Sequence, residues 1–495
     1  MKILILNPPF VDDFCRSARW AAKSRGRVQR HPDWLLVAAA VLEKENNVRF
    51  VDGAALNLKQ SDIEKMVAEF KPDMAVLHTT TPSIYNDAAY ARLIKEHSSA
   101  ITVYVGPHVS VEWENTFEIT GGSLDIIARG EYDHTLRDLA NLLKETLGGG
   151  REDFYRGLEN VGGISFRLPG DGSSNGLEIR KTGERPPIDV NELPFPAWHF
   201  IKPEWYNDAG KRSPFLTLIS GRGCFGMCTF CRDTPIMYGR KLRFREPRLV
   251  VEEMEYDLKL FPQLKEIMFE TDAFTASPRH VRGVCEEILR KNLKISWNCN
   301  TRVDMDLSLL PLMKKAGCRM LMTGFEFGDQ ALLDAVKKGV TLEQARRFAE
   351  EAKRHGLIIH GCFMIGAPNE TRASAKKTID FAKSLPLDTV QFSGICAYPG
   401  TEMYNWAREK GFLIPKDWRE WVSKEHEQVT LLDYPQLSKK EIDDLIDEGL
   451  RSFYLRPGQI LKMAFNISSL EDLKRKIFGF KGFLNYLLKN RVELK

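Results

Sequence analysis

Three closely spaced cysteines carry the clearest chemistry in the chain. Cys224, Cys228 and Cys231 form a CxxxCxxC pattern within the stretch GRGCFGMCTFC. A zinc site built on such cysteines needs a second pair, or histidines, nearby, and neither residue type occurs between Arg232 and Arg279. A 4Fe–4S cluster is normally held by one thiolate per iron, so three cysteines leave one iron open to another ligand. The pattern therefore predicts a cluster with an open coordination position.

The residues around these cysteines argue against a merely structural, buried set. Gly221, Gly223 and Gly226 surround the pattern, and the aromatic Phe230 directly precedes Cys231. In this context the motif resembles the signature of radical S-adenosylmethionine (SAM) enzymes. The resemblance implies that the three cysteines hold a 4Fe–4S cluster, that SAM chelates the open iron and that the Phe230 backbone touches adenine. It also implies an electron donor such as flavodoxin or ferredoxin.

The composition limits the classes of partner. With 495 residues the chain is long enough for more than one domain. Its 71 basic and 67 acidic residues give a net charge of only +4, which offers no reason to expect nucleic-acid binding. We find neither an apolar run long enough for a membrane span nor a secretory leader. Because nine cysteines, three of them in one motif, fit a reducing compartment, we expect a cytoplasmic protein, and we expect a monomer.

Residues 1–145 alternate short apolar runs with helical patterns. The runs are KILILN, VRFVDG, MAVLHTT, ITVYVG and DIIARG, and the helical patterns cover about 34–45, 61–70, 86–97 and 133–145. Buried strands separated by helices indicate a parallel, doubly wound α/β sheet of the Rossmann or flavodoxin-like kind. Such sheets bind ligands at the carboxyl ends of their strands.

The predicted strand ends of this region are small, polar or glycine-rich. They comprise Asn7, Pro8, Asp52, Thr79, Thr80, Thr81, Gly106, Pro107, His108, Gly130 and Glu131. An ordinary flavodoxin-like domain would use such residues for its turns alone. Taken in order, however, the turns resemble those of the cobalamin-binding domain that precedes the barrel in one class of radical SAM enzymes. That resemblance implies cobalamin at this edge.

One departure from other cobalamin domains concerns the ligand of cobalt. The Asp-x-His-x-x-Gly signature is absent, so the resemblance implies base-off cobalamin without a protein histidine on cobalt. His31, His78 and His108 are candidates near the corrin only in a loose sense, because a lone histidine at a strand end is more often a hydrogen-bonding turn residue.

The rest of the chain predicts a linker, a second α/β region and a helical end. Residues 146–212 are expected to form a hairpin and linker. Residues 213–412 contain the strand-like runs FLTLIS, KEIMFE, KISWNC, RMLMTGFE, LIIHGCFMIG and TVQFSG, each followed by a helical pattern. Six such units predict a partial (β/α)6 barrel with its chemistry at the carboxyl ends of the strands, and the cysteine motif follows the first of them. Residues 413–495 are expected to be helical and close to the substrate.

Polar residues at the later strand ends match family positions that contact SAM. They are Glu270, Thr271, Asp272, Arg302, Glu326 and Gly366. The resemblance implies that the first three bind the methionine amino group, which suits carboxylates. It implies that the arginine binds the methionine carboxylate, that Glu326 binds the ribose hydroxyls and that the glycine lies beside adenine. The alternatives are a solvated acidic loop for the first three and ion pairs in the barrel mouth for Arg302 and Glu326.

Two basic stretches lie outside these motifs. Between Arg16 and Arg30 there are six basic residues and no acid. We expect this loop either to be simply solvated or to contact the phosphate of cobalamin or an acidic substrate. The stretch LKRKIFGFKGFLNYLLKNRVELK at the end of the chain predicts a helix packed on the barrel, with docking to a membrane surface or a partner as the alternative.

These resemblances predict a cobalamin-dependent radical SAM C-methyltransferase. It would transfer a methyl group from SAM via methylcobalamin to an unactivated carbon of a peptide or protein side chain, a lipid or a natural product. A second SAM would supply the deoxyadenosyl radical that removes hydrogen. The alternatives are a non-methylating oxidative cyclase or ring-rearranging enzyme, and a corrinoid-binding carrier or sensor. The intact three-cysteine motif argues against a carrier, since an inert barrel needs no open iron.

Overall fold

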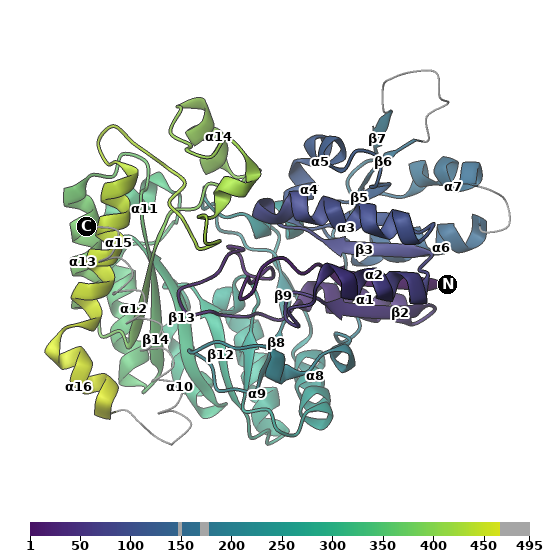
Figure 1. The fold of residues 1–495 in the computed structure, drawn as a ribbon. Helices are drawn as coiled ribbons and strands as arrows, with labels where there is room; N and C mark the ends of the chain where they lie inside the picture. Colours follow the sequence, from purple (N-terminus) through teal and green to yellow (C-terminus); the bar gives the residue numbers. More distant parts are fainter. Residues whose placement is uncertain (147–150, 169–177, 466–495) are drawn as a thin grey trace. The chain divides into compact units, whose positions relative to one another are not determined.

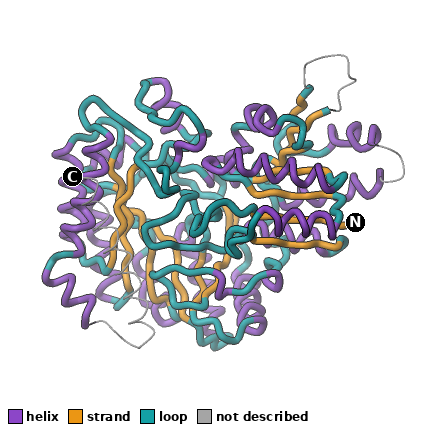
Figure 2. Tube along the Cα trace, viewed as in Figure 1, coloured by secondary structure: helices purple, strands orange, loops and turns teal. Residues whose placement is uncertain are grey.

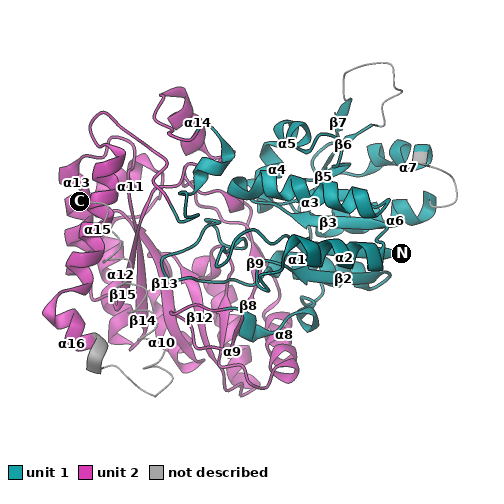
Figure 3. Cartoon of the chain, in the orientation of Figure 1, with its two compact units in different colours: residues 1–206, 235–239, 416–428 teal, residues 207–234, 240–415, 429–495 magenta. Residues whose placement is uncertain are grey.

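The computed structural model describes residues 1–146, 151–168 and 178–465. The chain divides into two compact units (Figure 3). Unit 1 contains residues 1–206, 235–239 and 416–428, and unit 2 contains residues 207–234, 240–415 and the chain from residue 429 on. Each unit has its own sheet with helices around it, as Figures 1 and 2 show. The α/β class predicted from the sequence is confirmed.

A seven-stranded sheet forms the centre of unit 1. Its strands are β1 (Lys2–Asn7), β2 (Asn47–Asp52), β3 (Met74–His78), β4 (Ile101–Val105), β5 (Ile126–Ala128), β6 (Ile164–Arg167) and β7 (Ile179–Lys181). Their order across the sheet is β2-β1-β3-β4-β5-β6-β7. The first five run parallel, and β6 and β7 add to one edge as antiparallel strands. The hairpin expected within residues 146–212 thus extends this sheet.

The strand order of unit 1 contains a switch point between β1 and β3. From β1 the chain passes to β2 on one side and then to β3 on the other. In doubly wound sheets, ligands bind beyond the carboxyl ends of the strands at such a point. We therefore expect a binding site among the residues that follow β1 and β3.

Helices cover both faces of the unit 1 sheet. They are α1 (Asp33–Glu43), α2 (Gln60–Phe70), α3 (Ile84–His97), α4 (Pro107–Val111), α5 (Trp113–Thr120), α6 (Asp133–Thr146) and α7 (Arg151–Gly157). Leu4 and Leu6 of β1 pack in one buried cluster with Ile63 of α2, Ile94 of α3 and Phe117 of α5. The intervening Ile3 and Ile5, which point to the other face, are equally buried. Burial on both faces explains why β1 is an almost continuous apolar run.

The centre of unit 2 is an open, wholly parallel sheet of six strands with helices between them. Its strands are β8 (Phe215–Leu218), β11 (Glu266–Phe269), β12 (Ser296–Thr301), β13 (Cys318–Glu326), β14 (Ile358–Ile365) and β15 (Thr389–Gly394). Their spatial order follows the sequence, with β8 and β15 at the two edges. This is the partial (β/α)6 barrel expected from the sequence.

The helices of unit 2 connect successive strands and complete its C-terminal part. They are α8 (Pro247–Leu260), α9 (Pro278–Arg290), α10 (Leu310–Lys315), α11 (Gln330–Ala335), α12 (Leu342–Arg354), α13 (Arg372–Ser384), α14 (Glu402–Glu409), α15 (Lys439–Tyr454) and α16 (Pro457–Phe465). Within the described ranges, no helix is both long and apolar enough to cross a membrane. The basic C-terminal stretch singled out in the sequence lies outside the described residues.

Two late segments of the chain belong to unit 1, which the sequence did not lead us to expect. In residues 235–239, the ring of Tyr238 stacks on Trp34 of α1 at a centroid distance of 4.4 Å. In residues 416–428, Asp417 accepts a hydrogen bond from the Tyr85 hydroxyl at 3.0 Å, and Trp418 donates its indole N–H to Asn115 at 2.7 Å. Unit 1 is therefore completed by residues that are distant in the sequence.

Candidate active site

The three motif cysteines lie on a loop at the carboxyl end of β8, the first strand of the barrel. The loop begins at β9 (Gly221–Arg222), which pairs antiparallel with β10 (Arg243–Phe244). Farther along it, the backbone N–H of Thr229 donates to Val336 at 3.1 Å, and its carbonyl accepts from Met403 N–H at 3.0 Å. The loop is thus held before the first cysteine and again between Cys228 and Cys231. Carboxyl ends of barrel strands are where such folds place their chemistry.

Gly226 gives the cysteine loop a position without a side chain between two thiols. A Cβ atom added there would lie 3.4 Å from Cys224 Sγ, 3.8 Å from Cys228 Sγ and 3.1 Å from Arg302 Nη1. The Gly226 N–H also donates to Cys224 Sγ at 3.4 Å. Both thiols therefore face the same small space, and a backbone N–H points at one of them. Thiolates hold an iron–sulfur cluster, and N–H groups near sulfur tune its reduction potential, so the residues fit the cluster.

A single metal ion would need a different arrangement. Within the part of the chain that the structure describes, no three His, Cys, Asp or Glu side chains are grouped to hold one ion. In a 4Fe–4S cluster each thiolate binds its own iron, so the ligands do not converge on one point.

The charges around Cys228 oppose the effect of its burial. Burial raises the pKa of the Cys228 thiol, and the positive charges of Lys338 and Arg302 act in the opposite direction. Glu326 and Cys224 raise that pKa further. Because the metal ligand is the thiolate, the two cations favour the form of cysteine that binds iron.

Arg302 lies beside the cysteines and is paired with a neighbouring carboxylate. It donates from Nε and Nη2 to the two oxygens of Asp304 at 2.9 and 2.8 Å. Its guanidinium also lies 5.0 Å from the centre of the Phe225 ring. The structure thus shows the ion pair that was the alternative for this residue. A bidentate carboxylate contact is also the geometry with which arginine would hold a ligand carboxylate.

Glu326 ends β13 and forms a buried ion pair. Lys338 Nζ lies 2.7 Å from Glu326 Oε1, and both side chains are at most one-tenth exposed. Lys338 carries no motif in the sequence, and only the fold brings it within reach of both Glu326 and Cys228. It is a site residue that sequence reasoning missed.

The three residues after β11 do not share one role. Thr271 is buried, accepts a hydrogen bond from the Ser220 N–H at 2.8 Å and lies 3.0 Å from the Ser220 hydroxyl. It ties the end of β11 to the residue just before the cysteine loop. Glu270 and Asp272, on either side, are partly exposed. They remain the candidates for binding an ammonium group.

Gly366, at the end of β14, is packed closely by the C-terminal part of unit 2. Its φ is +101°, and an added Cβ would lie 3.2 Å from Ile442 of α15. Its carbonyl accepts a hydrogen bond from Tyr434 at 2.7 Å, and the next N–H, of Ala367, donates to the buried Glu370 at 2.9 Å.

Phe230, the other residue expected beside adenine, lies in the cysteine loop and is partly buried.

In unit 1, the residues at the switch point form a buried polar network. Asn7, which ends β1, donates to Asp52 at 2.8 Å, and Tyr206 donates to the other oxygen of Asp52 at 2.9 Å. Burial raises the pKa of the Asp52 carboxyl, and hydrogen bonds from Ala55, Tyr206 and Asn7 oppose that shift. The network fixes the chain as it leaves β1 and β2.

Arg16 corrects the expectation for the basic loop. It is not solvated: its side chain and that of Asp87 are both fully buried, with Nη2 and Oδ1 2.8 Å apart. It also donates to Asn7 at 3.0 Å, to Ser83 at 2.9 Å and to the His78 carbonyl at 2.7 Å. Since its partners come from both sides of the switch point, Arg16 holds the ends of β1 and β3 together. Its charge is neutralised within the unit.

The other strand-end residues of unit 1 mostly hold their own turns. The hydroxyl of Thr79 donates to Val105 at 2.9 Å, and Gly130 N–H donates to Ser110 at 3.1 Å. Glu131 accepts from Ile188 N–H at 2.9 Å. His108 lies with its ring 5.0 Å from that of Trp418.

Pro8, Thr80, Thr81 and Gly106 are buried at the same edge, and Pro107 begins α4. At Gly106, where φ is +127°, a Cβ would come within 2.8 Å of the Thr79 carbonyl. The glycine therefore lets β4 and the turn after β3 approach closely.

Two comparisons identify the family. Residues 218–382, which contain the three cysteines, match the family described as Radical SAM superfamily. Over 482 residues the chain is 30% identical to an uncharacterized methyltransferase of Pyrococcus horikoshii, covering 97% of this chain and 98% of the relative. The chain belongs to the radical SAM methyltransferase family. Membership confirms the predictions of an enzyme, of a 4Fe–4S cluster and of SAM.

Two further likenesses concern function and fold. The enzyme is 26% identical to an anaerobic magnesium-protoporphyrin IX monomethyl ester cyclase of Rubrivivax gelatinosus, over 94% of this chain and 80% of the relative. Its fold is similar to that of the radical SAM methyltransferase TsrM from Kitasatospora setae, in the structure with cobalamin and a [4Fe-4S] cluster bound. The TM-score is 0.69 at 15% identity, with 98% of this chain and 99% of that chain covered.

Proposed function

We propose that the enzyme is a cobalamin-dependent radical SAM C-methyltransferase. The observation that carries the proposal is the cysteine loop around Gly226, at the carboxyl end of β8, in a chain whose relative over nearly its full length is named a methyltransferase. The fold shared with TsrM, whose structure holds cobalamin, supports a cobalamin site in unit 1.

Each residue of the unit 2 site has a proposed task. Cys224, Cys228 and Cys231 would bind three irons as thiolates and leave the fourth for SAM. When bound, the cluster supplies the electron that cleaves SAM. Glu270 and Asp272 would bind the ammonium of the methionine moiety, because charge-assisted hydrogen bonds suit such a pair.

Arg302 and Glu326 would orient the rest of SAM. Arg302 already holds the carboxylate of Asp304 in a bidentate contact, and a ligand carboxylate would take the place of that partner. Glu326 would accept hydrogen bonds from the ribose while its ion pair with Lys338 holds the carboxylate in place. The backbone of Phe230 and of Gly366 would line the adenine.

In unit 1, the turns after β1, β3, β4 and β5 would hold cobalamin. In that order the turns contain Asn7 and Pro8, Thr79 to Thr81, Gly106 to His108, and Gly130 with Glu131. The doubly wound strand order and its switch point fit a cofactor of this kind. Because these turns are tied together by internal hydrogen bonds, backbone and shape would do most of the recognition. The Asp-x-His-x-x-Gly motif is absent, so we propose that no histidine binds cobalt.

The acceptor would be an unactivated carbon of a peptide or protein side chain, a lipid or a natural product, and the electron would come from flavodoxin or ferredoxin. The second candidate is a non-methylating oxidative cyclase, which the likeness to the Rubrivivax gelatinosus cyclase over most of the chain favours. Both reactions consume SAM through the same cluster. Only the fate of the SAM methyl group separates them.

The decisive experiment follows that methyl group. The reconstituted enzyme is incubated under reducing, anaerobic conditions with cobalamin, candidate substrates and SAM carrying a deuterated methyl. A methyltransferase yields S-adenosylhomocysteine together with 5′-deoxyadenosine, and an intact labelled methyl on the product by mass spectrometry. Accumulation of 5′-deoxyadenosine with an unlabelled product, and no S-adenosylhomocysteine, would establish the cyclase instead.

A further inference from the structure

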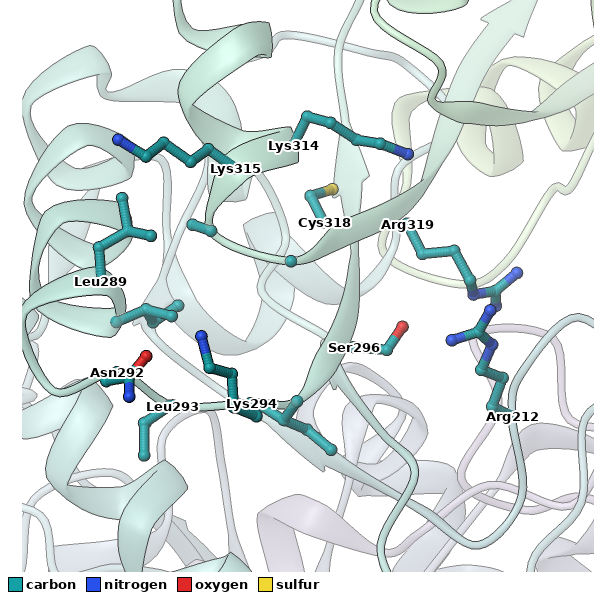
Figure 4. A pocket seen from close by; sticks show the side chains of 14 residues that line it. Arg212, Leu289, Asn292, Leu293, Lys294, Ser296, Lys314, Lys315, Cys318 and Arg319 are labelled. Carbon is teal, nitrogen blue, oxygen red and sulfur yellow. The ribbon is translucent and has the colours of Figure 1, made fainter.

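A pocket opens at the amino ends of two barrel strands in unit 2 (Figure 4). Its cavity volume is about 410 Å³. The end of α9, the residues before β12, the end of α10 and the start of β13 line it. A strand the length of β12 spans about 20 Å, so this pocket is well removed from the carboxyl ends where the cysteine loop lies. It is not part of the site described above.

The lining of this pocket is strongly cationic. Five of its fourteen residues are basic and none of the fourteen is acidic: the basic ones are Arg212, Lys294, Lys314, Lys315 and Arg319. Acids and bases are almost equally frequent in the chain as a whole, so a set of this kind is a local departure. Such a concentration of one sign attracts anions.

Two of these cations are already engaged. Arg319 donates to the buried Glu266 at 2.6 and 2.9 Å, and Lys314 donates to the carbonyl of Gly356 at 2.6 Å. The Glu266 carboxylate neutralises one positive charge. The pocket as a whole still keeps a clear positive excess.

The side chains of the other three, Arg212, Lys294 and Lys315, form no ion pair with an acidic residue in the described part of the chain, although the backbone N–H of Arg212 donates to Glu266 at 2.8 Å. Basic residues nearby that do not line the pocket behave differently, since Arg290 pairs with Glu287 and Lys291 with Glu255. Lys315 ends α10, where the helix dipole favours a cation. Arg212 and Lys294 lie in loops, so no helix end accounts for them.

The pocket also has two chemically different ends. Figure 4 shows the guanidinium groups of Arg212 and Arg319 beside each other at one end, and Leu289 and Leu293 at the other. The Arg212 guanidinium and the Nη1 group of Arg319, which does not donate to Glu266, offer N–H donors that suit a phosphate group. The leucines offer a surface that an apolar group would cover with a gain in free energy.

We propose that this pocket binds an organic phosphate with an apolar body. The phosphate dianion would lie between Arg212 and Arg319, within the positive field of Lys294 and Lys315, and the apolar body would cover Leu289 and Leu293. Because the pocket is remote from the cysteine loop, its occupant is an accessory ligand and not the group that is methylated.

Calorimetric titrations of the reconstituted full-length enzyme test this proposal with three probes: hexyl phosphate, inorganic phosphate and hexanol. Hexyl phosphate is expected to bind at least about tenfold more tightly than either of the others, since it alone satisfies both ends. Its affinity should fall as salt is added. Equal affinities for hexyl phosphate and inorganic phosphate would overturn the apolar part of the assignment.

Charge reversals test the location. In Arg212→Glu/Lys294→Glu, hexyl phosphate binding is expected to weaken by about tenfold or more. Both side chains are exposed, so the fold should tolerate the change, whereas Arg319 is left intact because it neutralises buried Glu266. The control Arg279→Glu/Arg282→Glu makes the same charge change on exposed residues of α9 that do not line the pocket. Equal binding by both double variants would refute the proposal, and SAM cleavage, measured separately, reports on the proposed function.

Discussion

The carboxyl edges of the two sheets differ in whether they leave side chains facing a space for a ligand. At the carboxyl edge of unit 1, buried side chains satisfy one another, as Arg16 does with Asp87 and Asn7 with Asp52. At the carboxyl edge of unit 2, the thiols of Cys224 and Cys228 instead face a space kept open by Gly226. Since the side chains of the unit 1 edge are bonded to one another, a ligand there would contact mainly backbone groups and the surface that they form. The unit 2 edge keeps donor atoms for a ligand still to be bound.

The largest effect is expected from a variant that alters only the unit 2 edge. Cys228→Ala should abolish SAM cleavage and lower the bound iron, because the cluster loses one of its three thiolates. Iron analysis and 5′-deoxyadenosine production after anaerobic reconstitution measure this.

Cys362→Ser is the matched control, since it changes a cysteine outside the motif, and it should keep both properties. Full SAM cleavage by the Cys228 variant would remove the cluster assignment.

The next largest effect is expected from a variant that alters the unit 1 edge. Asp87→Ala leaves the Arg16 guanidinium buried without its carboxylate, which should cost about 3–5 kcal/mol of stability in unit 1. Hydrogen exchange followed by mass spectrometry should show faster exchange in peptides from β1 and β3, with iron binding unchanged.

The exposed pair of Asp153 and Arg156 supplies the control. Asp153→Ala should alter stability by less than about 0.5 kcal/mol. Similar exchange rates in the two variants would mean that the buried pair does not hold the edge.

A smaller change tests whether the space at Gly226 matters. Gly226→Ala places a methyl group 3.1 Å from Arg302 Nη1, so this guanidinium must move by a few tenths of an ångström, and the methyl also fills the space beside Cys224 Sγ, 3.4 Å away. The rate of SAM cleavage is expected to fall by about tenfold. Gly183→Ala, at a position with open space around it, should leave the rate unchanged, and an unaffected Gly226 variant would show that the loop adapts freely.

The smallest effect contrasts two buried carboxylates. Asp87 has Arg16 as its partner, whereas neither carboxylate oxygen of Asp257 in α8 has a hydrogen-bond partner among the described residues. Burial and the negative charge of Glu253 raise the pKa of Asp257 well above its ordinary value, and Arg245 only partly opposes them. Because the pKa of folded Asp257 is raised, the contribution of this residue to the free energy of unfolding is fully present below the unfolded pKa of about 3.9. That contribution is lost as pH rises through the folded pKa.

Asp257→Asn should therefore stabilise the enzyme more at pH 8.5 than at pH 5.5, by about 1 kcal/mol or more. Thermal unfolding at the two pH values measures it. Glu252→Gln, on an exposed part of the same helix, should show no such pH dependence, and a pH-independent Asp257 variant would contradict the argument.

Local patterns were sufficient for the strands and for the cysteine motif. The run KILILN became β1 without a shift, because a strand buried on both faces is apolar throughout and needs no distant information. TVQFSG also became β15 without a shift, although this edge strand alternates buried with more exposed positions. The motif was readable because its three cysteines lie within eight residues.

Long-range pairs were not readable from the sequence. Arg16 sits in a run of basic residues for which we expected either solvation or an anionic ligand, and its partner Asp87 is 71 positions away. Lys338 has no motif, yet it reaches Glu326. The SAM and cobalamin contacts of the strand-end residues remain predictions. Many of these side chains bond to one another in the structure, and to contact a ligand they would have to exchange those partners for it.

The way unit 1 is completed has a consequence for its biosynthesis. The N-terminal sheet leaves the ribosome first, but Trp418 and Asp417, which bond to Asn115 and Tyr85, are translated more than 200 residues after residue 206. At about 5–20 residues per second, this interval lasts roughly ten seconds to a minute. During that time the nascent sheet lacks its final segment, and the surface that this segment later covers stays exposed. A gene truncated after residue 206 would leave that surface uncovered for good.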